Sequence, residues 1–531
     1  MKSRTTIPAV LVLSICVLGL AWPSQSGDSR DKSEILAVLT GDHADPSILR
    51  VGDDFYMTHS SYRNLPGLLV WRSKDLRRWE RVGYALHRNV GDVWAPDLAG
   101  HGNKFYIYFP AGGTNWVVTA DSPRGPWSDP VDLRVKGIDP GHVVAPDGKR
   151  YLYLDSGRVV ELAPDGLSVR GETKHVYEGW TYPKDWVVEG FYLESPKLAF
   201  RDGFYYLTAA QGGTAGPSTG HMAVSARSRS PLGPWENSPY NPVVHTWSRS
   251  DRWWSKGHGT IFSDAAGRWH IVYHAYENGY YPLGRNTLIE PIEGTADGWF
   301  KTVRDARREG PSRRLRNVVI EPDDFSGKEL KLQWQFSGLD SLDDQRIENG
   351  RLEIKSAAGR LRVLHATVGD HSYEASARLE TEGDVEAGLI AYYDDRAFAG
   401  IGIKGGEVFG MAKGAISGER IKAPAVKSST PRPEGRGLFM INPEPRFSSP
   451  PSKAGLGVGE RVKYLRIRMN EFDLSMASSD DGRRWTPYPY SLEVSGYHQN
   501  VLGGFSHLKL GIFGRGAGIL KIDDFAYRNL E

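Results

Sequence analysis

The sequence predicts an all-β protein in which a five-bladed β-propeller is followed by a β-sandwich. A glycine-containing turn that leads into an aromatic, alternating strand occurs five times. The marker glycines are 46 to 64 residues apart, near the length of one propeller blade, and are Gly52, Gly102, Gly148, Gly203 and Gly267. Composition also changes along the chain, because thirteen tryptophans lie from Trp71 to Trp299 and only Trp334 and Trp485 lie beyond.

The propeller is expected to span residues 35–300. Two copies of Ser-Pro-x-Gly-Pro-Trp, at 122–127 and 230–235, are the strongest internal evidence of repetition. This half shows no amphipathic helix of ordinary length. An all-β sandwich or barrel with coincidental spacing remains the alternative.

Residues 301–322 are expected to form a linker, because six arginines and a Gly-Pro pair interrupt the strand pattern there. The β-sandwich is expected over residues 323–531, since short alternating strands with turns between them are typical of that architecture. Residues 415–460 contain seven prolines and are expected to form a long loop. The expected strands are Arg351–Ile354, Tyr373–Leu379, Ala387–Tyr393, Ala399–Ile403, Tyr464–Met469, Leu474–Ala477, Leu508–Phe513 and Ile519–Phe525.

The N-terminus resembles a secretory signal peptide over residues 1–27, with a basic start and an apolar stretch of about 15 residues. A signal anchor is the alternative. Cys16, the only cysteine, lies inside this segment, so a mature chain without it has no disulfide or thiolate chemistry. Charge is nearly balanced, with 66 basic and 64 acidic residues, which gives no electrostatic case for nucleic acid. We expect a periplasmic or secreted protein with no membrane contact after signal cleavage, and its oligomeric state stays open.

Three carboxylates stand at matched positions of different blades, next to a proline or on the strand that enters the turn. They are Asp45, Asp139 and Glu194. The innermost strands of a propeller begin near one end of its channel, so these side chains are expected to converge there. Three carboxylates that lie close together cannot all ionise without a large cost in free energy, so the pKa of at least one should rise. One protonated and one ionised carboxyl are what glycosidic cleavage requires. For each residue alone, a plain turn signal is the alternative.

In these motifs the chain resembles the glycoside hydrolases of family 43, and most closely their two-domain β-xylosidases. The resemblance implies that Asp45 in Ala-Asp-Pro-Ser-Ile is the general base and Glu194 in Leu-Glu-Ser-Pro-Lys-Leu the general acid. It implies that Asp139 in Ile-Asp-Pro-Gly-His positions the acid and tunes its pKa. The C-terminal half resembles the concanavalin-like domain of the same enzymes, which packs on the propeller and helps to close the sugar site.

The same resemblance implies residues that bind the sugar. These are Trp94 and Asp97 in Trp-Ala-Pro-Asp, Arg285 in Gly-Arg-Asn-Thr, and Tyr62. It also implies that His258 points into the channel, where relatives often hold a calcium ion or a water. A histidine near a glycine turn is more often a structural hydrogen-bonding residue, and calcium prefers oxygen ligands. We expect no required cofactor, and a structural Ca²⁺ in the propeller channel stays open.

The sequence departs from the family pattern at Lys197, where a histidine is usual, and at Asn64, where xylosidases often have a second aromatic residue. Both are expected near the sugar, so the identity of the sugar is less secure than the mechanism. His142, directly after Asp139-Pro140-Gly141, has no assigned role.

The expected function is therefore that of an inverting, exo-acting β-xylosidase that binds xylose- or arabinose-containing oligosaccharides. Inversion requires the base and acid carboxyls to be about 6.5–9.5 Å apart. The alternatives are an α-L-arabinofuranosidase and a carbohydrate-binding propeller without turnover. A carbohydrate-binding propeller without turnover would lack at least one of the three carboxylates, and all three are present. A sialidase is excluded because the Asp-box motif at 478–485 occurs once, outside the propeller.

Overall fold

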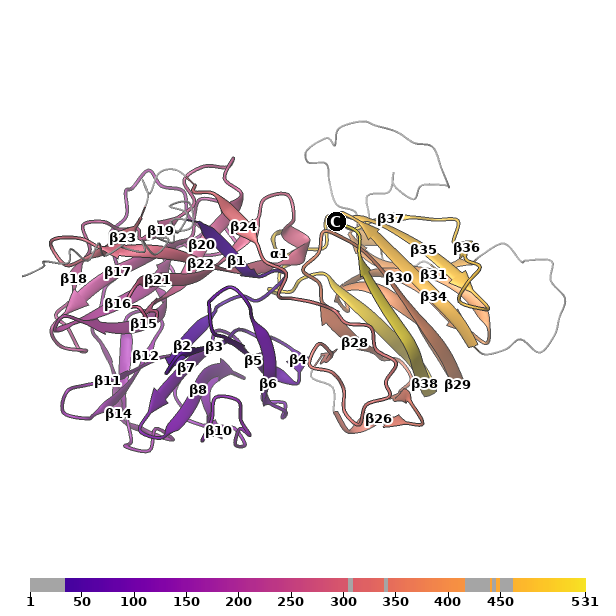
Figure 1. Ribbon diagram of the computed structural model, residues 1–531, viewed down its shortest axis with the longest axis horizontal. Coiled ribbons are helices and arrows are strands. Elements are labelled where there is room, and N and C mark those ends of the chain that lie inside the picture. The colour runs from indigo at the N-terminus through magenta and orange to yellow at the C-terminus, as the bar shows by residue number, and fades with distance from the viewer. Residues whose placement is uncertain (1–33, 304–308, 339–341, 416–439, 442–445, 449–461) are drawn as a thin grey trace, which may run out of the picture.

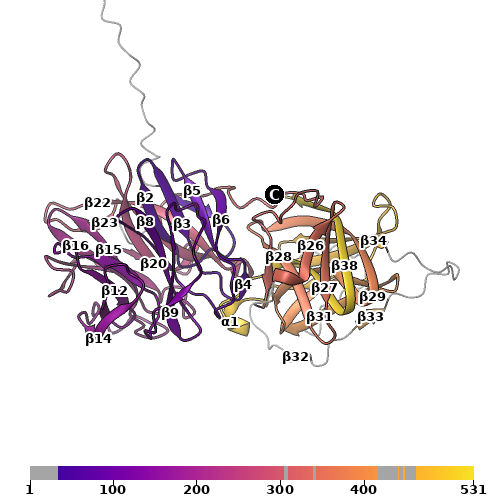
Figure 2. The same ribbon diagram turned by 90° about the horizontal axis from the view of Figure 1, so that it is seen from below.

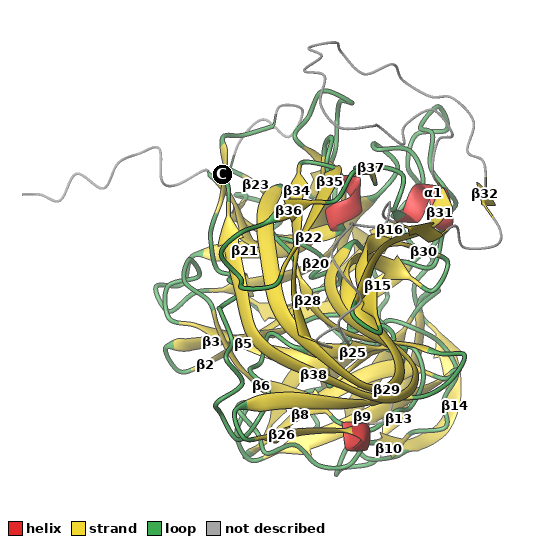
Figure 3. Cartoon of the chain, turned by 90° about the vertical axis from the view of Figure 1, so that its right-hand side faces the viewer, coloured by secondary structure: helices red, strands yellow, loops and turns green. Residues whose placement is uncertain are grey.

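The computed structural model describes residues 34–303, 309–338, 342–415, 440–441, 446–448 and 462–531. The expected signal peptide and most of the loop expected at 415–460 lie outside the described residues. Figure 3 shows a chain made almost entirely of strands and loops. The expected all-β fold class is confirmed, with a five-bladed propeller followed by a second strand-rich unit (Figures 1 and 2). Among the described residues, every helix is too short or too polar to span a membrane.

Each of the first three blades is a four-stranded antiparallel sheet whose strands follow one another along the chain. Blade 1 contains β2 (Ser47–Val51), β3 (Asp54–Thr58), β5 (Gly67–Ser73) and β6 (Glu80–Leu86). Blade 2 contains β7 (Asp97–His101), β8 (Lys104–Ala111), β9 (Thr114–Ala120) and β10 (Val131–Asp132). Blade 3 contains β11 (Gly141–Val144), β12 (Arg150–Leu154), β13 (Arg158–Leu162) and β14 (Val169–His175).

The last two blades carry extra strands. Blade 4 contains β15 (Glu194–Arg201), β16 (Phe204–Gln211), β17 (Met222–Ser228), β18 (Glu236–Asn237) and β19 (Val244–His245). Blade 5 contains β20 (Trp253–Ser263), β21 (Trp269–Glu277), β22 (Arg285–Gly294), β23 (Phe300–Thr302), β1 (Ile35–Leu39) and β24 (Ser312–Arg314). The N-terminal strand β1 pairs antiparallel with β22 and parallel with β24. Part of the segment expected to be a linker is therefore strand β24, because its backbone completes the outer edge of blade 5.

The aromatic second strand of each blade explains why the repeat was visible in the sequence. These strands are buried on both faces and pack against the neighbouring blade. Ile107 and Phe109 of blade 2 share one core cluster with Val70 of blade 1. Tyr153 of blade 3 shares another with Leu207 of blade 4. A propeller buries its blades against one another, so both faces of a central strand are apolar.

The C-terminal unit is built around two long, bent strands. β29 (Ser372–Asp394) and β38 (Lys509–Asn529) pair along nearly their whole length, and each contains two of the strands expected from the sequence. Gly383 and Gly516 lie inside them at positive φ angles of 84° and 111°, which allows the chain to bend without ending the strand. The other elements are β25 (Gln335–Ser337), β26 (Gln345–Glu348), β27 (Arg351–Ser356), β28 (Leu361–Thr367), β30 (Ala397–Lys404), β31 (Glu407–Ala415), β32 (Met440–Ile441), β33 (Arg446–Ser448), β34 (Val462–Asn470), β35 (Asp473–Ser479), β36 (Thr486–Pro487), β37 (Leu492–Glu493), η2 (Tyr281–Leu283, in the propeller), η3 (Leu342–Asp344) and α1 (Gln499–Leu502).

The two units are joined by a shared strand pairing. β4 (Asn64–Leu65), which leaves the propeller between β3 and β5, pairs antiparallel with β25 of the C-terminal unit. The Asn64 side-chain oxygen lies 3.0 Å from Nε2 of His365 and 3.4 Å from Oγ of Ser337. The pairing thus turns the Asn64 side-chain oxygen toward the seam between the units, and its expected place near the sugar stays a prediction.

Candidate active site

The five innermost strands bring the predicted carboxylates to one end of the propeller channel. Each of β2, β7, β11, β15 and β20 contacts the next, and β20 contacts β2, which closes the ring. Asp45 and Asp139 each lie two residues before an inner strand, and Glu194 is the first residue of β15. Nδ1 of His258, on β20, lies 3.3 Å from Oδ1 of Asp45 and 3.8 Å from Oδ2 of Asp139.

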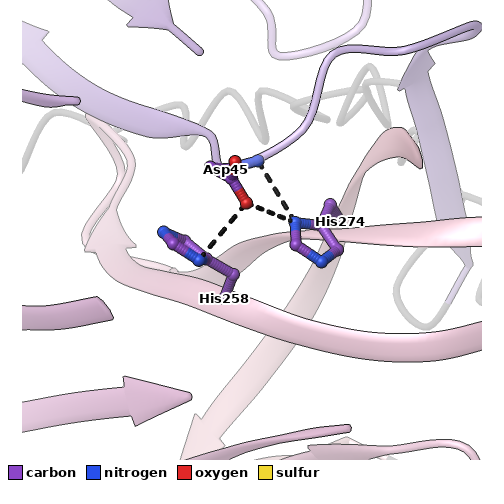
Figure 4. A group of neighbouring side chains, drawn as sticks. All are labelled: Asp45, His258 and His274. Carbon is purple, nitrogen blue, oxygen red and sulfur yellow. Dashed lines mark hydrogen bonds and ion pairs between the residues drawn. The ribbon is translucent and has the colours of Figure 1, made fainter. Parts of the chain in front are cut away.

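Asp45 is buried in a shell of polar groups from blades 1 and 5, of which Figure 4 shows His258 and His274 from blade 5. Its Oδ2 accepts a hydrogen bond of 2.5 Å from Oγ of Ser60. Its Oδ1 is 3.3 Å from Nη1 of Arg285, and its backbone N–H donates to Nδ1 of His274 at 3.1 Å. Nδ1 of His274 also lies 3.1 Å from Oδ1 of Asp45, and its Nε2 lies 3.1 Å from Oγ1 of Thr214.

The surroundings keep Asp45 ionised at neutral pH. Burial alone would raise its pKa, but Arg285, His258 and His274 together hold the pKa well below 3.8. Burial lowers the pKa of His258 to about 3 and that of His274 to about 4, so both rings are neutral at pH 7. Arg285 is therefore the cation that stabilises the Asp45 carboxylate.

Arg285 is itself held by three contacts besides Asp45. Its Nη2 donates to the hydroxyl of Tyr62, its backbone N–H donates to Oδ1 of Asp42 at 2.8 Å, and its guanidinium lies 5.2 Å from the ring of Phe505. Arg285 is 4% exposed and Tyr62 is 8% exposed. The structure thus brings Arg285 into direct contact with the expected base, and Tyr62 contacts that arginine.

Glu194 differs from Asp45 in its electrostatics. Burial, followed by the charges of Asp45, Asp155 and Glu189, raises its pKa from 4.5 to about 7. A carboxyl with this pKa is largely protonated below pH 7 and can donate a proton. After burial, the charge of Asp45 makes the largest contribution to this shift of the pKa.

Asp139 links the acid strand to the base. It is 4% exposed, and its Oδ2 accepts a hydrogen bond of 3.1 Å from the backbone N–H of Ser195, the residue after Glu194. Burial raises its pKa well above 3.8, and the charges of Glu194 and Asp45 add to this effect. This hydrogen bond holds the backbone next to Glu194, and the role of Asp139 in positioning the acid stays a prediction.

Five site residues have left-handed backbone conformations although none is glycine. The φ angles are 60° at Asp45, 50° at Tyr62, 56° at Asp139, 53° at Ser195 and 55° at His258. Such conformations are uncommon for residues with a Cβ, cost about 1–3 kcal/mol each and cluster at functional sites.

The two residues of the Trp-Ala-Pro-Asp motif have different surroundings. Trp94 is 38% exposed, so part of its ring is free to stack on a sugar. Asp97 is buried, with Oδ1 accepting from Lys197 at 2.9 Å and Oδ2 accepting from the backbone N–H of His142 at 2.7 Å. Both Asp97 oxygens thus bind protein donors, an arrangement that favours a structural role over the expected contact with substrate.

His258 is the residue at which a metal was expected. Asp45, His258 and His274 each offer a ligand atom, and these atoms lie within 4.8 Å of one another. Two imidazoles and one carboxylate do not fit calcium, which takes six to eight oxygen ligands, and the Arg285 cation already occupies this carboxylate. Nε2 of His258 is buried and has no hydrogen-bond partner among the described residues, which suits a bound water.

The C-terminal unit reaches this site through the segment after α1. Phe505 lies against Arg285, and Nδ1 of His507 is 3.5 Å from Oδ2 of Asp42. The backbone N–H of Leu508 donates to the carbonyl of Pro282 at 2.7 Å. The packing of this unit on the propeller thus fixes the side of the site that contains Arg285.

Sequence reasoning missed His274, Ser60, Asp42, Phe505 and His507. His274 carried a weak signal, because it stands in the aromatic strand at 269–277. The role left open for His142 is structural, since its Nε2 accepts from Nε of Arg150 at 3.0 Å and its ring stacks on Tyr108.

Replacement of Gly141 by alanine is expected to destabilise the protein by about 2 kcal/mol or more. A Cβ at this position would lie well inside van der Waals contact with the carbonyl oxygen of Pro196, and backbone cannot move aside as a side chain can. Urea unfolding of Gly141→Ala measures the change. The matched control is Gly100→Ala in β7, where the nearest atom would be 3.6 Å from the new Cβ. Equal stability of the two variants would contradict the expected clash.

Known proteins resemble this chain in sequence and in fold. A model described as glycosyl hydrolases family 43 matches residues 36–300. A non-reducing end alpha-L-arabinofuranosidase of Bacteroides ovatus is 31% identical over 68% of this chain and 73% of its own length. A xylan 1,3-beta-xylosidase of a Vibrio species is 32% identical over 67% of this chain and 76% of its own. A crystal structure of xylan beta-1,4-xylosidase from Bacillus halodurans C-125 shares the fold, with a TM-score of 0.76 over 92% of this chain and 99% of that chain at 24% identity.

Proposed function

Because the chain belongs to the glycosyl hydrolases of family 43, it is a glycosidase, and we propose that it releases terminal xylose from xylo-oligosaccharides with inversion. The observation that carries the mechanism is the contrast between two carboxyls at one end of the channel. Asp45 has a pKa well below 3.8, whereas Glu194 has a pKa of about 7. One ionised base and one protonated acid are the pair that single-displacement hydrolysis needs. The Vibrio relative, named as a xylosidase, supports xylose as the sugar.

In the proposed reaction, Asp45 takes a proton from a water molecule as the water oxygen bonds to the anomeric carbon. Glu194 gives its proton to the glycosidic oxygen as the bond from that oxygen to the anomeric carbon breaks. The products are α-xylose and a shortened oligosaccharide. Asp45 is left protonated and Glu194 ionised, and exchange with solvent restores both. Room for the water requires a separation of about 6.5–9.5 Å between the two carboxyls.

The neighbouring groups give the base and acid their roles. Arg285 keeps Asp45 ionised and, with the hydroxyl of Tyr62, offers donors to the hydroxyls of the sugar. Asp139 fixes the backbone beside Glu194 through the N–H of Ser195. Trp94 offers an exposed ring for stacking. Asp45 and Glu194 carry out both proton transfers, and no step of the proposed reaction runs through a metal ion.

Cleavage of α-L-arabinofuranosides is the second candidate. The Bacteroides ovatus relative is named for that activity. Asn64 also stands where xylosidases often have a second aromatic residue, so this chain lacks that aromatic side chain at this position. The same base and acid would serve either sugar, since the roles of the carboxyls depend on the anomeric centre alone.

Proton NMR of xylobiose hydrolysis tests the proposal. We expect the signal of α-xylose to appear first, followed by β-xylose as mutarotation proceeds. A preparation of the Asp45→Asn variant, purified in the same way, controls for contaminating hydrolases.

Early β-xylose would mean retention and would overturn the assignment of Asp45 as base. Turnover of arabinofuranosides without turnover of xylobiose would replace the xylosidase proposal with the second candidate. Failure on both classes would favour a carbohydrate-binding protein.

A further inference from the structure

A lysine is buried beneath the active site with its charge fully satisfied. Lys197 is 4% exposed, and its Nζ donates to Oδ1 of Asp97 at 2.9 Å, to the carbonyl of Pro96 at 3.0 Å and to the carbonyl of Pro140 at 2.7 Å. An ammonium group has three donors, and all are used here. Its expected place near the sugar is therefore not supported, because its donors face protein groups inside the channel.

The partners of this ion pair come from neighbouring blades. Lys197 is on β15 of blade 4, Pro96 and Asp97 begin blade 2, and Pro140 precedes blade 3. Asp97 also accepts a hydrogen bond of 3.3 Å from Ser47 of blade 1. The pair therefore joins the starts of four inner strands at the depth of the carboxylates.

The contact between Lys197 and the Pro140 carbonyl ties the strand of the expected acid to the segment that contains Asp139. Lys197 is three residues after Glu194, and Pro140 directly follows Asp139. The pairing of β15 with β16 shifts register between Glu194 and Lys197, and Ser195 within this irregularity has a left-handed backbone. Irregularities of this kind re-aim side chains next to active sites. The Lys197 contacts fix the end of the irregular segment from which Glu194 projects.

Stability alone is a poor reason for this arrangement. Moving two charges out of water costs free energy that their attraction often does not recover, and apolar replacements of such pairs are frequently neutral or stabilising. The pair instead fixes the position of the backbone that carries Glu194. This matters because a misplacement of about 1 Å at a reacting group can lower the rate roughly 100-fold.

We propose that Lys197 and Asp97 form a clamp that positions Glu194 against Asp139 and the leaving oxygen without touching the sugar. This inference rests on the proposed function and assigns Lys197 as a positioning residue for the proton transfer. It reassigns Asp97 from substrate contact to the same clamp.

The test compares leaving groups of different acidity in the Lys197→Met variant. Protonation by Glu194 matters most for a poor leaving group and least for a good one such as 2,4-dinitrophenolate. We expect kcat/KM to fall about 100-fold for a 4-methoxyphenyl glycoside and less than 10-fold for the 2,4-dinitrophenyl glycoside of the same sugar. The sugar is the one that the wild-type protein hydrolyses.

Two further variants separate positioning from folding. Lys104→Met removes an exposed lysine that pairs with Asp121 on the surface of blade 2, and it should change neither rate. The double variant Lys197→Met/Asp97→Asn removes both buried charges, so it folds without an unpaired ion, and it should show the same leaving-group dependence as the single variant.

An equal loss on both glycosides in the folded variants would overturn the clamp, because general destabilisation does not distinguish leaving groups. A wild-type protein that hydrolyses neither glycoside of either sugar would instead contradict the proposed function. The wild-type measurement thus distinguishes the two failures.

Discussion

Replacement of Asp45 by asparagine is expected to lower kcat/KM by about 10⁴-fold on every glycoside that the protein hydrolyses. Asparagine has the same shape but cannot accept a proton, and general-base catalysis contributes roughly 10²–10⁴-fold. Loss of the negative charge beside the anomeric carbon adds to the effect, since the transition state is oxocarbenium-like. The loss should not depend on the leaving group, because the base acts on water. Steady-state rates on glycosides with good and poor leaving groups measure this directly.

The control for Asp45→Asn is Asp264→Asn. Asp264, in blade 5, is buried like Asp45, but it binds Arg268 and His270 at the turn between β20 and β21. Its replacement should therefore affect stability without lowering the rate. A decrease in melting temperature is expected for Asp45→Asn as well, because Arg285 loses its main counterion. Rates are therefore compared well below both melting temperatures. Retention of more than a tenth of the activity would place the base elsewhere.

Much of the site could be predicted because a propeller repeats its geometry. Once glycine turns and aromatic strands define the blades, residues just before each inner strand must meet at one end of the channel. That reasoning placed Asp45, Asp139 and Glu194 together although they are far apart in sequence. The same regularity predicted that the pKa of one carboxyl should rise, but it did not predict neighbours such as His274 and Ser60, which depend on distances within the folded protein.

The residues that sequence reasoning missed come from contacts without a local pattern. His507 and Phe505 reach the propeller because the two units pack together, through contacts such as the β4–β25 pairing and the hydrogen bond from Leu508 to Pro282. Lys197 looked like a residue near the sugar because it follows Glu194 closely, yet the irregularity after Glu194 turns it into the channel. In the C-terminal unit, four expected strands are two long ones, since Gly383 and Gly516 bend the chain where the sequence pattern suggested a break.

Replacement of Glu194 by glutamine is expected to lower kcat/KM by about 10³-fold or more on xylobiose and far less on glycosides with good leaving groups. Glutamine cannot protonate the glycosidic oxygen, and only a poor leaving group needs that proton. This dependence distinguishes the acid from the base, since Asp45→Asn should affect all leaving groups alike. A uniform loss in Glu194→Gln would contradict its assignment as the acid.

The pH dependence of the wild-type protein follows from the same residue. Glu194 must be protonated to act, so kcat/KM should fall tenfold per pH unit above about 7, the pKa of Glu194. On the acid side kcat/KM should stay constant until Asp45 is protonated, which requires a pH well below 3.8, as long as the protein is still folded there. The basic limb should disappear in Glu194→Gln measured on a good leaving group.

A neighbouring charge offers an independent check on the cause of the raised pKa. Glu189 is exposed, and its charge is one of those that raise the pKa of Glu194. Glu189→Gln keeps an oxygen that can accept the hydrogen bond from the backbone N–H of Ala215 but removes the charge. The basic limb should therefore move to lower pH while the rate at pH 5 stays unchanged. Because Asp139 and Glu194 interact, the pKa that the basic limb reports is a property of the two carboxyls together. An unmoved limb in Glu189→Gln would leave burial and Asp45 as the causes, and an unmoved limb in Glu194→Gln would assign the titration to another group.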